Sequence, residues 1–283
     1  MRQYLTEFME RFSYPEEDRK TILESYEKVN SEEFCELLKL YEENMFCDMK
    51  EIRPRMKALA EAVGVHEYTG DLLLLICMSK TLKEYYKKAS YTEEMWYASM
   101  CDLKYKLVEC HEVYGICGTF VPDWYVRFFR LERFAFGKLQ FEEVCFKKNY
   151  EGQGVSLNPE SMVLNVHIPR TGTKLDRESM VESYRLAAEF YKNPVFMCHS
   201  WLLYPKNKEI LSKSSNLYAF ISDYDIFDYA DYEDYKEVWR LFDVNYDGNV
   251  DHLPQNTSLR RAYADWIRNG EPTGWGHGVY VYR

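Results

Sequence analysis

The chain has 283 residues, of which 46% are hydrophobic and 17% aromatic, so it is globular and long enough for two domains. Its formal net charge of −10 repels phosphate backbones and excludes nucleic acid from the expected partners. The longest apolar run, residues 72–78, is too short to cross a bilayer, and the N-terminus lacks the apolar core of a signal peptide. We therefore expect a cytoplasmic protein without a membrane partner.

The first 115 residues predict a helical domain with short loops. Apolar side chains recur at helical spacing, and capping residues precede several of these runs. Helix starts are expected at Ser13, Ser31, Met49, Asp71 and Thr92, and helix stops at Gly64 and Gly115.

The pattern changes after Pro122, where strands begin to alternate with helices. A hairpin or bent strand is expected around Gly137, a Gly-rich turn at 151–161, strands at 162–169, 195–205, 216–227 and 278–282, and a helix at 177–192. The acidic, tyrosine-rich segment 222–237 reads as a solvated insertion, or as a surface that attracts a cationic amine. The predicted fold is α+β with a mixed sheet, in two domains, residues 1–121 and 122–283.

Residues 243–254, DVNYDGNVDHLP, resemble a calcium-binding EF-hand loop. Asp243, Asp247 and Asp251 stand at ligand positions, but the twelfth position, which needs a bidentate glutamate, is Pro254. An ordinary turn is therefore expected. The eight cysteines contain no CxxC pair, which argues against a zinc site and a disulfide scaffold, so we expect no metal.

The segment 163–180, VLNVHIPRTGTKLDRESM, predicts a buried strand, a turn through Gly172 and a helix capped by Asp176. Such a junction offers unpaired backbone N–H groups and the positive end of a helix dipole, to which Arg170 and Lys174 add full charges. This combination suits a pyrophosphate. A plain strand-to-helix turn with two solvated basic side chains explains the same residues equally well.

Three side chains are candidates for proton transfer. His167 lies at the carboxyl end of the strand before the loop, where open sheets bind ligands, and His199 lies in the next strand. Glu142 shares one face of an earlier strand with Gln140. The alternatives are hydrogen-bonded core histidines and a carboxylate on a solvent-facing edge strand.

These elements resemble GCN5-related N-acetyltransferases (GNAT), and in particular a bacterial two-domain family that joins a helical N-terminal acyltransferase domain to a GNAT-like C-terminal domain. The resemblance rests on FRLERFAFGKLQFE, LNVHIPRTGTKLDRESM, FMCHSWLLYP, SSNLYAF, DHLPQNTSLRRA and GWGHGVYVY, within residues 128–283. The loop has one glycine where the family signature has more, and residues 207–213 lack the usual tyrosine acid.

The resemblance implies a coenzyme A thioester as co-substrate, with its pantetheine arm between the strands of His167 and His199. It also implies a pyrophosphate site at Ile168, Arg170, Thr171, Gly172, Thr173 and Lys174. The implied reaction is N-acyltransfer, with acetyl as the expected group, to a small-molecule amine or a peptide by direct attack. His167, His199 and Glu142, in that order, are the candidates for taking the proton. A non-catalytic acyl-CoA-binding or scaffold protein is the alternative.

Overall fold

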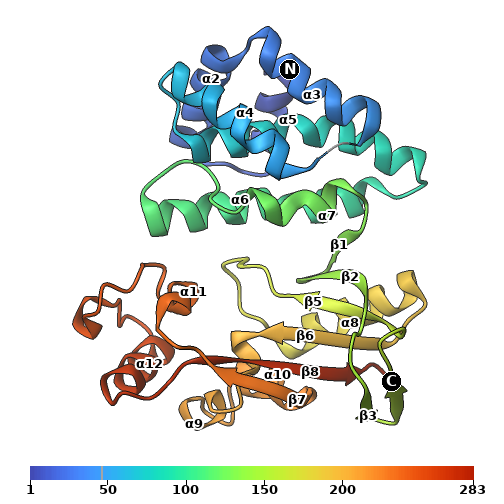
Figure 1. The fold of residues 1–283 in the computed structure, drawn as a ribbon, viewed down its shortest axis with the longest axis vertical. Helices are drawn as coiled ribbons and strands as arrows, with labels where there is room; N and C mark the ends of the chain where they lie inside the picture. Colours follow the sequence, from blue (N-terminus) through green and yellow to red (C-terminus); the bar gives the residue numbers. More distant parts are fainter. Residues whose placement is uncertain (46) are drawn as a thin grey trace. The chain divides into compact units, whose positions relative to one another are not determined.

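The computed structural model describes residues 1–45 and 47–283. The chain forms two compact units: Met1–Phe134 with Arg170–Gly172, and Ala135–Pro169 with Thr173–Arg283. Figure 1 shows the helices of the first unit and the sheet of the second. The domain limits predicted from the sequence, 1–121 and 122–283, remain a proposal.

The first unit is built from helices. They are α1 (Arg2–Arg11), α2 (Glu16–Val29), α3 (Glu32–Asn44), α4 (Met49–Ala62), α5 (Glu67–Lys88), α6 (Glu93–Tyr114), the 3₁₀ turn η1 (Pro122–Tyr125) and α7 (Val126–Phe129). Helix α5 is buried on every side along residues 69–79, which explains the apolar run in its sequence. The predicted caps Ser31 and Thr92 each accept a backbone N–H, and Gly115 ends α6 in the left-handed conformation.

Two predicted helix starts are wrong. Helix α2 begins after Pro15, and Ser13 lies outside it in a left-handed turn. Helix α5 begins one turn before Asp71, capped by His66, whose Nδ1 accepts the N–H of Tyr68. Asp71 is instead a buried carboxylate that accepts a hydrogen bond from Arg53 Nε at 3.1 Å. Burial raises the pKa of Asp71 to about 7, although the charge and hydrogen bond of Arg53 act to lower it. A buried, paired aspartate and a helix cap look alike in sequence.

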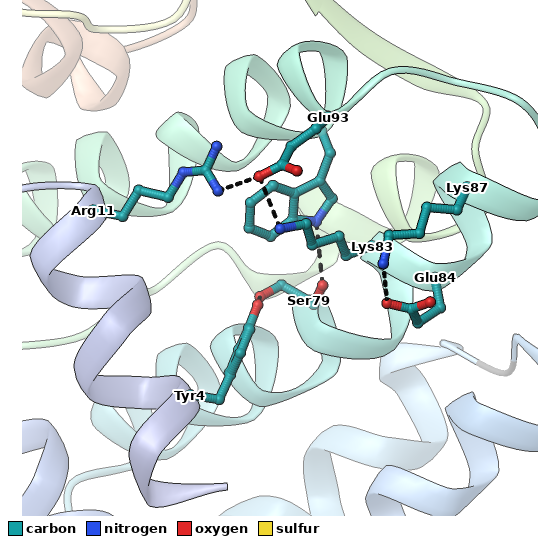
Figure 2. Close-up of polar contacts among 8 residues, drawn as sticks. Tyr4, Arg11, Ser79, Lys83, Glu84, Lys87 and Glu93 are labelled. Atoms are coloured by element: carbon teal, nitrogen blue, oxygen red, sulfur yellow. Dashed lines mark hydrogen bonds and ion pairs between the residues drawn. The ribbon is translucent and has the colours of Figure 1, made fainter.

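Glu93 joins three helices at the start of α6, as Figure 2 shows. Its carboxylate accepts hydrogen bonds from Arg11 of α1 and from Lys83 of α5, the latter at 2.9 Å. The Lys83 ammonium also lies 5.0 Å from the ring centroid of Trp96. The bonds from Lys83 and Arg11 lower the pKa of Glu93 to about 2.

Glu93→Gln should therefore lower the melting temperature slightly at pH 7. Because the pKa of this carboxyl is depressed in the folded state, its contribution exists above the unfolded value of 4.5 and disappears as pH falls to about 2. Melting curves of the variant and the wild type at pH 7 and pH 3 check this dependence on pH. The control is Glu84→Gln, which breaks an exposed ion pair with Lys87 on α5. An equal difference from wild type at both pH values would contradict the role given to this carboxylate.

The second unit contains a six-stranded sheet in the order β1-β2-β5-β6-β8-β7 and a separate hairpin β3-β4. The strands are β1 (Arg133–Phe136, which begins at the end of the first unit), β2 (Leu139–Cys145), β3 (Tyr150–Gly152), β4 (Val155–Leu157), β5 (Met162–His167), β6 (Val195–Ser200), β7 (Asp225–Asp231) and β8 (Gly274–Val281). The intervening elements are α8 (Arg177–Tyr191), η2 (Trp201–Leu203), α9 (Asn207–Ile210), α10 (Asn216–Asp223), η3 (Lys236–Val238), α11 (Trp239–Phe242), η4 (Val250–His252) and α12 (Ser258–Arg268).

The C-terminal strand β8 lies between β6 and β7, pairing with both in antiparallel fashion, while β5 and β6 are parallel. One sheet face packs rings from Phe141, Tyr184, Phe196 and Tyr280. The other face carries a core of Phe146, Tyr150, Leu157, Val163, Met197 and Val279, which the hairpin β3-β4 helps to build. The α+β class with a mixed sheet is confirmed.

Two predictions for the second unit are wrong. Residues 216–223 form helix α10 rather than a strand. The tyrosine-rich acidic segment is not simply an insertion, because residues 225–231 form edge strand β7, paired with β8. An edge strand with one solvated face is polar enough to resemble a loop.

In the loop that resembles an EF-hand, the acidic side chains have basic partners. The carboxylate of Asp243 accepts a hydrogen bond from Arg260, and that of Asp251 accepts one from Arg268 at 2.9 Å. An oxygen of Asp247 lies 2.7 Å from His252 Nδ1. Among the described residues, no helix combines the length and apolarity that crossing a membrane requires.

Candidate active site

The sheet opens between β5 and β6 at their carboxyl ends. β5 pairs with β2 as far as His167, which lies opposite Gln140, and β6 pairs with β8 as far as Ser200. Between β5 and β6, however, the pairing is confined to Leu164–Phe196 and Asn165–Met197. The last residues of the two strands are therefore not paired with each other, at the place where the family resemblance puts the pantetheine arm. We call this divergence of the two strand ends the opening.

His167, Glu142 and Asn165 meet beside this opening. The register places Glu142 opposite Asn165 on neighbouring strands, and cross-strand partners share a sheet face. Glu142 Oε1 accepts from Asn165 Nδ2 at 2.9 Å and lies 2.9 Å from His167 Nε2. The carboxylate side chain is 5% exposed and the imidazole 18%. Glu142 thus lies inside the sheet rather than on a solvent-facing edge strand.

The tautomer of His167 decides which contact of Nε2 is a hydrogen bond. A protonated Nε2 donates to the Glu142 carboxylate and leaves Nδ1 as the basic nitrogen, whereas an unprotonated Nε2 accepts from Asn165 Nδ2 at 3.2 Å. A carboxylate that orients an imidazole in this way also stabilises the imidazolium that forms when it accepts a proton. The arrangement has the chemistry of a general base with an orienting partner.

His199 lies across the opening from His167. His199 is two residues beyond Met197, and His167 is two residues beyond Asn165, the partner of Met197, so both histidines occupy equivalent positions on one face. The contacts of His199 are with β8: its ring centroid is 4.6 Å from that of Trp275 and 5.5 Å from that of His277. The two predicted histidines therefore border the same opening from opposite strands.

His277 extends this row and was not singled out from the sequence. It lies opposite His199 on β6 and Asp228 on β7, and its Nε2 is buried without a hydrogen-bond partner among the described residues. Burial, together with the charges of His199 and Lys148, lowers the pKa of His277 to about 4, and burial lowers the pKa of His199. Burial therefore disfavours the charged form of both imidazoles.

The glycines of β8 are the signal that could have identified His277. In GWGHGVYV the glycines alternate with larger side chains, as in a strand with one crowded face. A Cβ at Gly276 would lie 2.1 Å from the carbonyl oxygen of Leu203, and one at Gly274 would lie 2.3 Å from that of Ala230. Close backbone packing on this face therefore requires glycine and sets Trp275 and His277 on the opposite face.

The predicted phosphate loop connects β5 to α8. Gly172 has φ +72°, and the space around its Cβ position is open. Asp176 caps α8 by accepting the N–H of Ser179, and Lys174 is exposed. Arg170, which belongs to the first unit, donates to Glu112 of α6, so its charge already has a carboxylate partner. The strand, glycine turn and capped helix agree with the sequence prediction.

Lys138 is a cation near this loop that the sequence prediction did not include. Its ammonium lies 2.7 Å from Asp176 Oδ2 and 2.6 Å from the carbonyl oxygen of Lys174. This contact, with the hydrogen bonds from Ser179, holds the pKa of Asp176 well below its usual range. Lys138 is brought to the helix N-terminus by the turn between β1 and β2, a long-range contact that sequence spacing does not reveal.

Among residues 1–45 and 47–283, the structure offers one cluster of three possible metal ligands, Asp18, His111 and Cys117, in the first unit. Asp18 Oδ1 and His111 Nε2 are already bonded to each other at 2.5 Å. Burial also raises the pKa of the Cys117 thiol, which opposes the thiolate form that binds metals. The cluster is therefore explained as a hydrogen-bonded structural pair beside a buried thiol.

Comparison with protein families identifies both halves of the chain. Residues 133–280 match the GNAT-like C-terminal domain, and residues 3–131 match the N-acyltransferase N-terminal domain. Comparison with curated protein sequences gives no match.

Solved structures share the fold over nearly the whole chain. An acyltransferase mutant in complex with octanoyl-CoA is 18% identical, with 99% of this chain and 88% of that one covered and a TM-score of 0.79. An acyltransferase in complex with decanoyl-CoA and teicoplanin is 17% identical, with coverages of 98% and 87% and a TM-score of 0.73. A third complex, with CoA and 10C-teicoplanin, is 18% identical, with coverages of 98% and 87% and a TM-score of 0.75.

The family resemblance drawn from the sequence is thus confirmed, and so is the assignment as an acyltransferase. The co-substrates in these solved relatives, CoA and acyl-CoA, are those that the resemblance implies. The chain belongs to the GNAT-like acyltransferase family in which an N-acyltransferase N-terminal domain precedes a GNAT-like C-terminal domain.

Proposed function

We propose that the protein transfers an acyl group from coenzyme A to an amine by direct attack. The observation that carries this proposal is the opening between β5 and β6, bordered by the bonded pair His167 and Glu142. A pantetheine arm in this opening would place its thioester beside His167. The solved relatives hold octanoyl- and decanoyl-CoA, so the donors to test extend from acetyl-CoA to decanoyl-CoA.

The reaction needs no covalent enzyme intermediate. The amine nitrogen attacks the thioester carbonyl carbon, the C–S bond breaks, and the products are an amide and coenzyme A, whose sulfur receives the proton that the amine loses. We assign the removal of that proton to His167, oriented by Glu142, with His199 as the second candidate across the opening. Backbone N–H groups near the end of β5 would stabilise the developing oxyanion.

The pyrophosphate is assigned to the loop between β5 and α8, residues 168–174. The open space at Gly172 permits close approach of a phosphate to the backbone, and the N-terminus of α8 contributes its dipole. Arg170 would exchange its Glu112 partner for phosphate oxygens, whereas Lys174 is exposed. Lys138, close to the loop, adds positive charge.

Arg170→Ala combined with Lys174→Ala should weaken CoA binding by roughly tenfold or more. The loss of even one charge-assisted hydrogen bond to the phosphate costs about 1.5–3 kcal/mol, and 1.4 kcal/mol is tenfold in Kd. Calorimetric titration with CoA measures the change. The melting temperature should stay close to that of the wild type.

Two controls separate phosphate binding from structure. Glu112→Ala removes the same ion pair from the other side and should not weaken CoA binding. Lys213→Ala removes an exposed charge elsewhere in the unit and should have no effect. Unchanged affinity in the double variant would remove the phosphate assignment. CoA binding without turnover of any donor and amine would favour a non-catalytic acyl-CoA-binding protein.

A further inference from the structure

Asn165 contacts both members of the proposed catalytic pair. It is the last residue of β5 that is paired with β6, and its direct partner on β2 is Glu142. Its Nδ2 lies 2.9 Å from Glu142 Oε1 and 3.2 Å from His167 Nε2, and those two atoms are themselves 2.9 Å apart. Three polar atoms from two strands therefore form a closed triangle beside the opening.

The sheet register explains why Asn165 holds the carboxylate. Side chains directly opposite each other on antiparallel strands have Cβ atoms about 4.5–5.5 Å apart, whereas diagonal neighbours lie farther apart, at about 7–8 Å. Glu142 lies opposite Asn165, and His167 lies opposite Gln140, so His167 is only a diagonal neighbour of Glu142. The hydrogen bond from Asn165 therefore anchors the carboxylate at the position from which one oxygen reaches His167.

The chemistry of the carboxylate fixes the orientation of the Asn165 amide. An ionised carboxylate only accepts hydrogen bonds, so the NH₂ group, and not the amide oxygen, faces Glu142. The side chain of Glu142 is 5% exposed, and a carboxylate with so little access to water needs donors that stabilise its charge. Asn165 supplies one such donor without adding a positive charge.

An ionised Glu142 also decides between the two neutral forms of His167. If Nε2 lacked a proton, its lone pair would face the carboxylate oxygen at 2.9 Å, which is repulsive. A proton on Nε2 removes this repulsion, gives Glu142 Oε1 a second donor beside Asn165 Nδ2, and leaves Nδ1 unprotonated. Whatever keeps the carboxylate ionised therefore keeps Nδ1 as the basic nitrogen.

We infer that Asn165 is a positioning residue for proton transfer. It keeps Glu142 ionised and aimed at His167, and so holds the imidazole in the tautomer whose Nδ1 accepts the proton of the attacking amine. The inference rests on the proposed acyltransfer. Asn165 itself takes no proton. Its removal should destabilise the base form of the pair most, because in that form the carboxylate has no imidazolium beside it.

Asn165→Ala should move the acidic limb of the pH profile of kcat/KM to higher pH by roughly one unit. The limb reports the proton that the pair of Glu142 and His167 must lose to become active. Loss of the Asn165 hydrogen bond destabilises the proton-free pair more than the protonated pair, whichever of the two groups carries the proton, so the apparent pKa rises. Activity should recover toward the wild-type value at alkaline pH.

Two other variants distinguish this shift from a general loss of structure. Glu142→Gln removes the negative charge that stabilises the imidazolium, so it should move the same limb to lower pH. Asn193→Ala removes an amide that donates to the carbonyl oxygen of Met162 at 2.8 Å, at the other end of β5, and should leave the limb unmoved. The titratable neighbours on this face are His199 and His277. Burial lowers the pKa of both, so they titrate below an ordinary histidine and do not account for an upward shift.

Nitrogen-15 NMR of the His167 imidazole tests the inference without turnover. The spectrum distinguishes a protonated from an unprotonated ring nitrogen, and His167→Gln identifies the signals. In the wild type, the neutral imidazole should carry its proton on Nε2, and Asn165→Ala should raise the apparent pKa of the ring.

A proton on Nδ1 of the neutral wild-type imidazole would overturn the inference. So would an unchanged pKa of the ring in Asn165→Ala, or activity that falls equally at every pH with the limb unmoved. A raised pKa in a protein that acylates no amine would support the role of Asn165 in fixing the tautomer and would contradict only the proposed acyltransfer.

Discussion

His167→Gln should lower kcat by about 10²–10⁴-fold, the usual contribution of a general base. The imidazole borders the opening between β5 and β6 and is bonded to the buried carboxylate of Glu142. Glutamine keeps a polar side chain at this position but cannot accept a proton near neutral pH. Steady-state release of free CoA thiol from an acyl-CoA and an amine measures the loss.

Three comparisons distinguish a catalytic from a structural role for His167. The affinity of the His167→Gln variant for CoA should stay within about twofold of that of the wild type, because the imidazole is not assigned to the phosphate site. Glu142→Gln should lower kcat less and should shift the acidic limb of the pH profile, since it alters only the orientation and basicity of the imidazole. His199→Gln should have the smaller effect of the two histidine variants, and the reverse order would assign the base to His199.

Phe196→Ala should reduce the free energy of unfolding by about 3–5 kcal/mol, as expected for a large buried aromatic side chain. Phe196 is fully buried on β6, and its ring centroid lies 4.8 Å from that of Tyr184 on α8 and 5.6 Å from that of Phe141 on β2. Its truncation leaves a cavity between the helix and the sheet. Denaturant unfolding of the second unit, followed by a spectroscopic probe, measures the change.

Tyr229→Ala is the matched control for this stability prediction. Tyr229 is also an aromatic residue in a strand, but it is 55% exposed on edge strand β7. Its removal should change stability by no more than about 0.5 kcal/mol. Similar effects for the two substitutions would contradict the view that the ring packing between α8 and the sheet stabilises this unit.

Local patterns in the sequence predicted the parts of the fold that depend on neighbouring residues. The caps at Ser31, Thr92 and Asp176 accept backbone N–H groups within three residues, so their motifs are complete in a short window. The hairpin at Gly137 could likewise be predicted from a short window, because its signal is a glycine, here with positive φ, between two apolar runs. The two wrong caps have different causes. The chain after Ser13 does not enter the helix until Glu16, and Asp71 is buried inside a helix that already began at Glu67; neither feature is visible in the local motif.

The candidate site depends on contacts that local patterns do not contain. The sequence suggested His167 and Glu142 separately, but their contact requires the register that sets Gln140 opposite His167 across β2 and β5. The alignment of His199 with His277 likewise requires β8 to lie beside β6, although most of the second unit separates them in the sequence. Burial of the His277 ring nitrogen is visible only once the sheet is assembled.

The most direct test of acyltransfer is to incubate the protein with acetyl-, octanoyl- or decanoyl-CoA and a panel of amines, and to follow both products. We predict that free CoA thiol and the acylated amine appear in equal amounts, that mass spectrometry detects no acylated protein, and that His167→Gln abolishes most of both signals. Saturable CoA binding without either product, for every donor and amine, would contradict the proposal that this protein is an active N-acyltransferase.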